Sequence, residues 1–261
     1  MFRSLATGAS GMEAEQTKLD VTANNIANVS TNGFKRGRAE FADLIYQQTR
    51  GAGAATGAGT MAPAATEIGL GVRLTSTARE HSQGELHNTG NQLDVAIEGK
   101  GFLPVTMPNG TTEYTRNGAL QMTAEGKLVT SDGYPVGGDI TIPPDAQSVT
   151  IAADGTVTAT TATDVTATAL GQIQIASFAN PGGLEGQGGN LFRETAASGT
   201  AVLGNPGEGG AGNLRQGMLE GSNVNVVEEM VDLISGQRAY EVNSRVIKAA
   251  DEMLAETAQL H

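Results

Sequence analysis

Three histidines and a few carboxylates are the side chains of this sequence from which reaction chemistry would have to be built. His81, His87 and His261 do not fall into a motif with metal-ligand spacing. Asp94 and Glu98 have the residue types of the acid and base pair of a glycan-cleaving enzyme. Because both lie on one alternating apolar run, we expect them to form the solvent face of a strand. The sequence therefore predicts that this protein is not an enzyme.

Several glycine-containing segments resemble the beginnings of ligand loops without their remaining parts. Asp132-Gly133 and Asp154-Gly155 are not followed by the further oxygen ligands of a calcium loop, so we expect turns at both positions. The segments 69–71 and 99–101 lack the third glycine of a nucleotide-binding loop. The chain has no cysteine, which excludes disulfides, thiolate chemistry and Cys-based zinc sites. We expect neither a cofactor nor a metal.

Charge and hydropathy exclude further classes of partner. The formal net charge of -12 disfavours a nucleic acid, whose phosphates attract basic proteins. No apolar run approaches the roughly 20 residues that span a bilayer, so no membrane insertion is expected. Met1-Phe2-Arg3 leads directly into a polar amphipathic segment, and we therefore expect no Sec-type signal peptide.

Both ends of the chain carry hydrophobic residues at sevenfold spacing. The N-terminal ladder is Leu5, Met12, Leu19 and Ile26, and the C-terminal ladder is Val226, Leu233, Tyr240, Ile247 and Leu254, joined by Met230 and by a second ladder of Ala239, Val246, Met253 and Leu260. A period of 3.5 residues is typical of a coiled-coil seam. We expect ten of these residues to form the subunit interface of the terminal helices. They are the four members of the N-terminal ladder, the five members of the first C-terminal ladder, and Met230. The alternative is a pair of ordinary amphipathic helices that cover the middle of the chain.

Start and stop signals bound both expected helices. The first begins near Ser4 and ends in the turn-forming segment 28–33, a length of roughly 25 residues. Asn225 is the expected N-cap of the second helix, with Glu228 three positions later, and the periodic run continues to Leu260.

The middle of the chain predicts β-structure. From about Ile68 to Phe178, apolar and polar residues alternate between turn signals such as Asp-Gly, as expected for an antiparallel sheet or small barrel. Glycine-rich clusters at 51–59 and 182–221 separate this part from the ends. The expected fold class is α+β. The expected division is 1–33 with 222–261 as a helical coiled-coil domain, 34–67 as a connector with a Gly/Ala-rich insertion, 68–180 as a central β-domain and 181–221 as a return connector.

Four segments together resemble a known family. The run 16–36 is similar to the N-terminal signature of bacterial flagellar rod and hook proteins, and the runs 220–230 and 237–243 are similar to its C-terminal partner. Residues 114–118 and 128–136 resemble the β-domain of the same group. The signature positions are Asn24, Asn25, Asn28, Gly33, Phe34, Lys35, Arg36, Asn223, Asn225, Arg238 and Tyr240.

Within this axial family the chain most resembles the distal rod members. Its length leaves no room for the outer domain of hook proteins, and the segment from Tyr46 to Arg73 looks like the insertion that separates distal rod from hook. The insertion is richer in Gly and Ala than the family pattern. The proximal rod and the hook-type subunits are the alternatives within the family, and a secreted peptidoglycan-acting enzyme is the alternative from another class.

The resemblance implies a function without turnover. Family members leave the cell through the flagellar type III export apparatus and polymerise into a helical tube that crosses the periplasm as the basal-body rod. The tube transmits torque as a rigid drive shaft. The implied partners are further copies of the chain, the proximal rod and hook proteins, and the P- and L-ring bushing.

Overall fold

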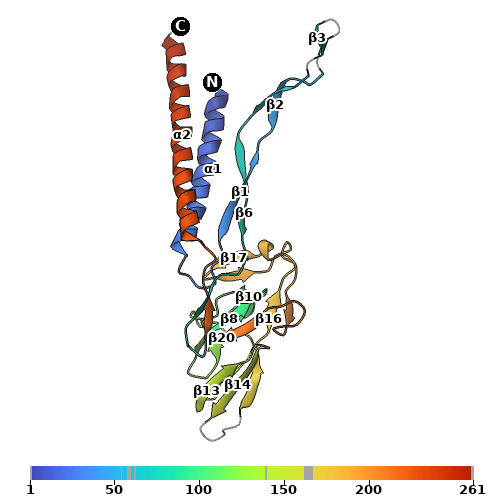
Figure 1. The fold of residues 1–261 in the computed structure, drawn as a ribbon, viewed down its shortest axis with the longest axis vertical. Helices are drawn as coiled ribbons and strands as arrows, with labels where there is room; N and C mark the ends of the chain where they lie inside the picture. Colours follow the sequence, from blue (N-terminus) through green and yellow to red (C-terminus); the bar gives the residue numbers. More distant parts are fainter. Residues whose placement is uncertain are drawn as a thin grey trace. The chain divides into compact units, whose positions relative to one another are not determined.

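The structure is a computed structural model that describes residues 2–53, 55–57, 60–61, 63–138, 140–161 and 167–259. Their contacts divide the chain into two compact units (Figure 1). The helical unit comprises Met1–Ala27, Gly37–Ala78 and Asn225–His261, and the β-rich unit comprises Asn28–Arg36 and Arg79–Val224. Two α-helices and many antiparallel strands confirm the α+β class among the described residues.

The two helices of the helical unit pack side by side in opposite directions. Helix α1 spans Phe2–Ala27 and helix α2 spans Val226–Gln259. Glycines permit their close approach: a Cβ atom on Gly8 would lie 2.9 Å from Ile247 Cγ1, and one on Gly236 would lie 3.0 Å from Leu19 Cδ2. Gly8 near the start of α1 thus lies beside Ile247 in the second half of α2, and Leu19 lies beside Gly236 near the start of α2, so the two helices run antiparallel. The coiled-coil seam expected from the heptads stays a prediction.

The helix ends follow the local signals that the sequence carries. Helix α1 ends at Ala27, just before the expected turn segment. Asn225 is the N-cap of α2, since its Oδ1 accepts a hydrogen bond of 3.1 Å from the Val227 N–H. In the second C-terminal ladder, Val246 and Met253 are about half exposed, and Leu260 lies outside the described residues.

A long β-hairpin completes the helical unit. Its strands pair antiparallel as β1 (Gly37–Asp43) with β6 (Val72–Arg79), β2 (Tyr46–Arg50) with β5 (Thr66–Gly69), and β3 (Ala55–Gly57) with β4 (Thr60–Met61). Gln48 lies opposite Glu67, and its Nε2 donates a hydrogen bond of 3.1 Å to the Glu67 carboxylate. The Gly/Ala-rich cluster at 51–59 therefore lies in the outer part of a hairpin, with 54, 58 and 59 outside the described residues.

The β-rich unit is assembled from small antiparallel sheets. Strands β17, β18, β10 and β9 form a four-stranded sheet, strands β13, β14 and β15 a three-stranded one, and β11–β12, β16–β19, β20–β8 and β21–β7 are pairs. The strands are β7 (Leu86–Asn88), β8 (Val95–Glu98), β9 (Leu103–Thr106), β10 (Thr112–Thr115), β11 (Gln121–Met122), β12 (Leu128–Val129), β13 (Ala146–Ile151), β14 (Thr156–Thr161), β15 (Thr168–Gln172), β16 (Ile175–Ser177), β17 (Glu185–Gly188), β18 (Leu191–Arg193), β19 (Val202–Gly204), β20 (Asn213–Gln216) and β21 (Met218–Glu220), with a short 3-10 helix at Pro181–Gly183.

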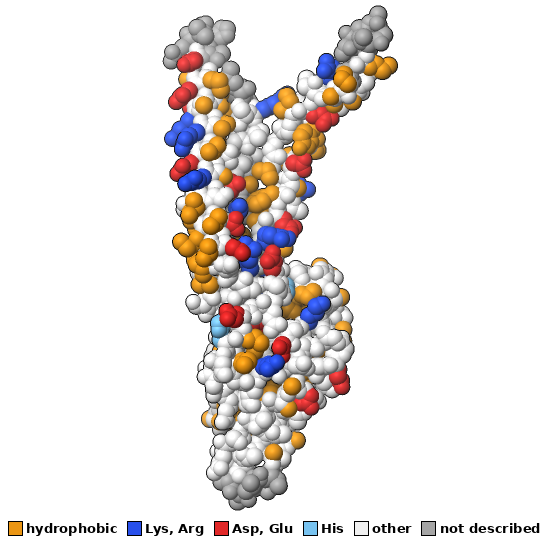
Figure 2. Space-filling model, viewed as in Figure 1, with side chains coloured by type: hydrophobic (Ala, Val, Ile, Leu, Met, Phe, Trp, Pro, Cys, Tyr) orange, Lys and Arg blue, Asp and Glu red, His pale blue; other side chains and the backbone are white. Residues whose placement is uncertain are grey.

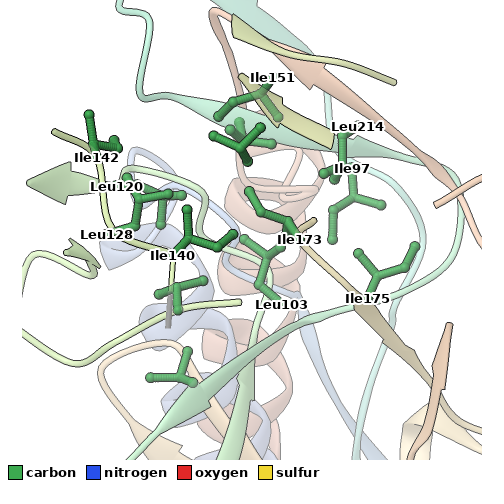
Figure 3. Packing of buried hydrophobic residues seen from close by; sticks show 14 of the residues in the cluster. Ile97, Leu103, Leu120, Leu128, Ile140, Ile142, Ile151, Ile173, Ile175 and Leu214 are labelled. Atoms are coloured by element: carbon green, nitrogen blue, oxygen red, sulfur yellow. The ribbon is translucent and has the colours of Figure 1, made fainter. Parts of the chain in front are cut away.

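The last strands of the β-rich unit return to its beginning. Strand β20 pairs with β8, and β21 pairs with β7, so the glycine-rich stretch 182–221 contributes five strands to the unit. The core is formed by aliphatic side chains from these distant segments, including Ile97, Leu103, Ile173 and Ile175 (Figure 3). Burial of such side chains is worth about 1.5–3 kcal/mol each. None of the described helices is long and apolar enough to cross a membrane.

Candidate assembly surface and buried charge cluster

Among the described residues, the histidines and carboxylates singled out for chemistry are not brought together, and His261 lies outside the described residues. The expected solvent face is wrong for Asp94, which is buried and whose Oδ2 accepts a hydrogen bond of 2.6 Å from Thr89 Oγ1. Glu98 forms an exposed ion pair of 2.7 Å with Arg215. Asp154 lies in the expected turn, where hydrogen bonds from Thr156 lower the pKa of its carboxyl. Among the described residues no group of three or more His, Asp or Glu side chains is arranged to hold a metal ion.

Three charged side chains from distant parts of the sequence meet in the interior of the β-rich unit. Lys35, Arg116 and Glu220 have side-chain exposures of 1%, 5% and 0%. Lys35 Nζ donates to Glu220 Oε1 at 2.6 Å, and Arg116 Nε donates to Glu220 Oε2. We call these three residues the charge cluster. One carboxylate thus serves two cations, which leaves one net positive charge in the cluster.

Main-chain groups complete the charge cluster. Lys35 Nζ also donates to the Ser82 carbonyl at 2.7 Å, and the Gly84 N–H donates to Glu220 Oε1 at 2.9 Å. The guanidinium of Arg116 donates to three carbonyls at the end of β8 and just after it, those of Ile97, Gly99 and Gly101, at 2.5–2.8 Å. Burial lowers the pKa of the Lys35 ammonium, while the neighbouring Glu220 carboxylate raises it.

Asn223 ties together the chain segments that enter and leave the β-rich unit. Its Oδ1 accepts a hydrogen bond of 2.7 Å from the Arg36 N–H, and its Nδ2 donates to the Glu80 carbonyl at 2.8 Å and to Ser82 Oγ at 2.9 Å. The segment before Arg36, the segment around Glu80 and the segment around Asn223 are therefore fixed to one another.

Gly33 occupies a position that a side chain would not fit. Its φ is +71°, and a Cβ atom there would lie 2.7 Å from the Asn117 nitrogen and 2.8 Å from the Arg116 carbonyl carbon. The Gly33 N–H donates to the Glu220 carbonyl at 2.8 Å, and Phe34 beside it is buried. The glycine thus lets the chain pass directly over the charge cluster.

Asn25 has the corresponding role in the helical unit. Its amide exchanges two hydrogen bonds of 2.9 Å with the backbone of Gly37, and its Nδ2 also donates to the Glu229 carboxylate at 3.1 Å. Both side chains are almost fully buried. Asn25 therefore joins the end of α1 to the start of β1 and to the first turns of α2.

The other signature residues lie nearer the surface. Asn28 Oδ1 accepts a hydrogen bond of 3.2 Å from Thr31 Oγ1, whereas Asn24 and Arg238 are exposed on their helices. Tyr240 is 40% exposed. Family resemblance alone does not separate residues that hold one chain together from residues on its outer surface.

The expected interface residues divide into two groups. Seven are half-buried: Leu5, Met12, Leu19, Ile26, Leu233, Ile247 and Leu254. Three on α2 are exposed: Val226, Met230 and Tyr240. The sequence ladders therefore select residues on more than one face of α2.

Helix α2 carries an exposed apolar stripe that the heptad pattern did not identify in full. Its members are Val227, Met230, Val231, Ile234, Val242, Val246 and Met253, all 45% or more exposed. Hydrophobic side chains follow α2 along its visible face in Figure 2. These residues recur at separations of three, four, seven or eight positions, which is a second helical periodicity, and this was the signal that could have identified them. We call this set the α2 stripe.

Three protein-family models each match a different part of the chain. Family models match residues 5–35 as a flagella basal body rod protein, residues 96–159 as a flagellar hook protein FlgE/F/G D1 domain, and residues 215–260 as the flagellar basal body rod FlgEFG protein C-terminal region. These ranges contain most of α1, the charge-cluster residues Lys35, Arg116 and Glu220, and all of α2.

Relatives that match over their full length share one name with each other. The flagellar basal-body rod protein FlgG of Agrobacterium fabrum is 50% identical over 253 residues, which is 97% of both chains. FlgG of Caulobacter vibrioides is 48% identical over 99% of both chains, and FlgG of Bacillus subtilis is 45% identical over 100% of this chain and 99% of its own. Because this identity extends along the whole chain, the protein belongs to the family of flagellar basal-body rod proteins FlgG, which are structural subunits and not enzymes.

Proposed function

We propose that this rod subunit forms the distal rod as a helical tube of identical copies that transmits motor torque to the hook. The single observation that carries the proposal is the α2 stripe. Seven apolar side chains are exposed along one helical face, and contiguous exposed apolar patches mark sites of contact with other molecules. A surface that fits a different surface on the next copy generates an open helical polymer. The stripe supplies such a surface along most of α2.

The terminal helices form the assembling part in this proposal. The half-buried ladder residues of α1 and α2 pair as a coiled coil within the subunit, and the stripe packs on neighbouring copies. The division into 1–33 with 222–261, 34–67, 68–180 and 181–221 belongs to the same proposal. Proximal rod and hook-type subunits remain alternatives within the family, and the hairpin favours the distal rod.

The hairpin of β2 and β5 stiffens the polymer by packing between neighbouring subunits. Large apolar side chains stand out from it, including Ile45, Tyr46 and Ile68. Wedged between copies, the hairpin prevents the sliding that would let the tube bend. Glycine and alanine near its tip permit close backbone approach.

The remaining partners follow from the position of a distal rod. We infer contacts with the proximal rod and the hook at the two ends of the tube and with the P- and L-ring bushing around it. Export proceeds through the flagellar type III apparatus, and no nucleic acid, cofactor or membrane insertion takes part.

Met230→Asp tests the role of the α2 stripe. Met230 is 54% exposed, so the variant should fold as the parent does but place a carboxylate in the subunit contact. We expect the concentration needed for assembly to rise by at least about tenfold, the effect of 1.4 kcal/mol. Sedimentation and electron microscopy measure it.

Met122→Asp is the matched control, because Met122 is 48% exposed on β11 of the β-rich unit. It should assemble close to the parent's concentration. Assembly of Met230→Asp at the parent's concentration, or equal loss in both variants, would contradict the assignment of the interface to α2.

A further inference from the structure

The charge cluster joins an early, a middle and a late point of the chain. Lys35 precedes the hairpin, Arg116 follows β10, and Glu220 ends β21, the last strand of the β-rich unit. Sequence separations of 185 and 104 residues lie between Glu220 and its two cationic partners. Contacts of such separation form late, since the entropy of long loops opposes them.

Without Glu220 the charge cluster contains two cations and no anion. Lys35 Nζ would keep the Ser82 carbonyl as its partner, and Arg116 would keep three carbonyls. Carbonyl dipoles do not neutralise two buried charges, and the Arg116 charge also lowers the pKa of Lys35. Burying charges that lack a counter-ion is strongly unfavourable. Closure of the unit around Lys35 and Arg116 is therefore disfavoured until a carboxylate is present.

Glu220 also supplies acceptors to both early segments. Its carbonyl accepts from the Gly33 N–H at 2.8 Å, and its carboxylate accepts from the Gly84 N–H at 2.9 Å. Strands β20 and β21 place the same segment against β8 and β7. Glu220 thus supplies the negative charge and the hydrogen-bond acceptors for the early segments in the same step.

We propose that the charge cluster is a folding checkpoint: the β-rich unit closes only when Glu220 reaches Lys35 and Arg116. An incomplete chain then remains open, because its buried cations have no counter-ion. For a subunit that is exported through a narrow channel, as proposed above, the checkpoint delays folding until the C-terminal part has emerged. This consequence rests on the proposed function, whereas the order of folding does not.

Glu220→Gln in the full-length chain tests the checkpoint, because it keeps the shape of the side chain and removes its charge. We expect refolding from urea, followed by circular dichroism after rapid dilution at low protein concentration, to slow by at least about tenfold. Glu98→Gln is the control, since Glu98 forms an exposed ion pair with Arg215 on neighbouring strands β8 and β20. Its refolding rate should stay within about twofold of the parent's.

A second substitution distinguishes the excess of cations from a simple loss of contacts. Lys35→Met alone leaves Arg116 paired with Glu220 and should refold within about threefold of the parent. Adding Lys35→Met to Glu220→Gln removes one uncompensated cation, so the double variant should refold at least about threefold faster than Glu220→Gln.

Two results would overturn the checkpoint. One is refolding of Glu220→Gln at the parent's rate, even if it unfolds faster. The other is a double variant that refolds no better than Glu220→Gln, including the case in which neither folds. Since these measurements use monomeric protein, a failure of the assembly proposal would not alter them.

Discussion

Replacing His81 by phenylalanine should remove part of the protein's sensitivity to acid. The His81 ring lies edge-on to Phe102 and Phe192, with centroid distances of 5.5 and 5.4 Å. Both ring nitrogens are buried and have no hydrogen-bond partner among the described residues. Burial, together with the charges of Lys35, Arg79 and Arg116, lowers the pKa of His81 from 6.5 to about 4.

The size of the effect follows from these two pKa values. The folded pKa is depressed, so the stability contributed by neutral His81 is present above about pH 6.5 and is lost as the pH falls toward 4. At about pH 5 the unfolded chain binds this proton and the folded chain largely does not. Linkage then destabilises the parent by about 2 kcal/mol relative to neutral pH. His81→Phe abolishes this loss, because phenylalanine does not titrate.

Urea unfolding followed by circular dichroism at about pH 7.5 and pH 5 measures the difference. The change in unfolding free energy between the two pH values should be about 2 kcal/mol smaller in His81→Phe than in the parent. His87→Gln is the control, since His87 is exposed on β7 outside the aromatic group. This variant should show the same change in unfolding free energy between the two pH values as the parent. If the change in unfolding free energy between the two pH values were the same in His81→Phe as in the parent, the reasoning would be refuted.

Three further changes probe the remaining parts of the molecule. Ile247→Asp puts a carboxylate against Gly8 of α1, so it should separate the helices and abolish assembly while the β-rich unit melts as before; calorimetry and electron microscopy check both outcomes. Replacing residues 49–66 by Asn-Gly keeps Gln48 beside Glu67 and should give curved or compliant filaments, whereas straight filaments of unchanged stiffness would exclude the wedge. Gly33→Ala should destabilise the β-rich unit by about 1–3 kcal/mol in urea unfolding, and an unchanged midpoint would contradict the steric account.

Local signals in the sequence predicted the elements that depend on local chemistry. The N-cap at Asn225 and the end of α1 before residue 28 were both readable, because a cap or a turn needs only a few neighbouring residues. The turn at Asp154 followed from the same kind of signal. The hairpin of β2 and β5 was harder to predict, since its glycine-rich tip resembles a flexible linker in composition.

The charge cluster could not be predicted from spacing. Lys35 was identified through the signature, but its partner Glu220 is 185 residues away and Arg116 belongs to another motif. No period or local pattern connects residues at such separations. The available signal was that each of the three lies inside one of the segments that resemble the family, and the structure joins these segments by a shared carboxylate.

The two apolar faces of α2 give a physical basis for the proposed assembly. A helix that needs one partner carries one apolar face, and Leu233, Ile247 and Leu254 provide that face within the subunit. Val231 and Val242 belong to a second face, which remains 62% and 55% exposed. The close approach at Gly8 and Gly236 brings α1 onto the first face and cannot cover the second. The apolar surface of α2 therefore exceeds what one chain buries, and its remaining favourable burial is available through contact with other copies.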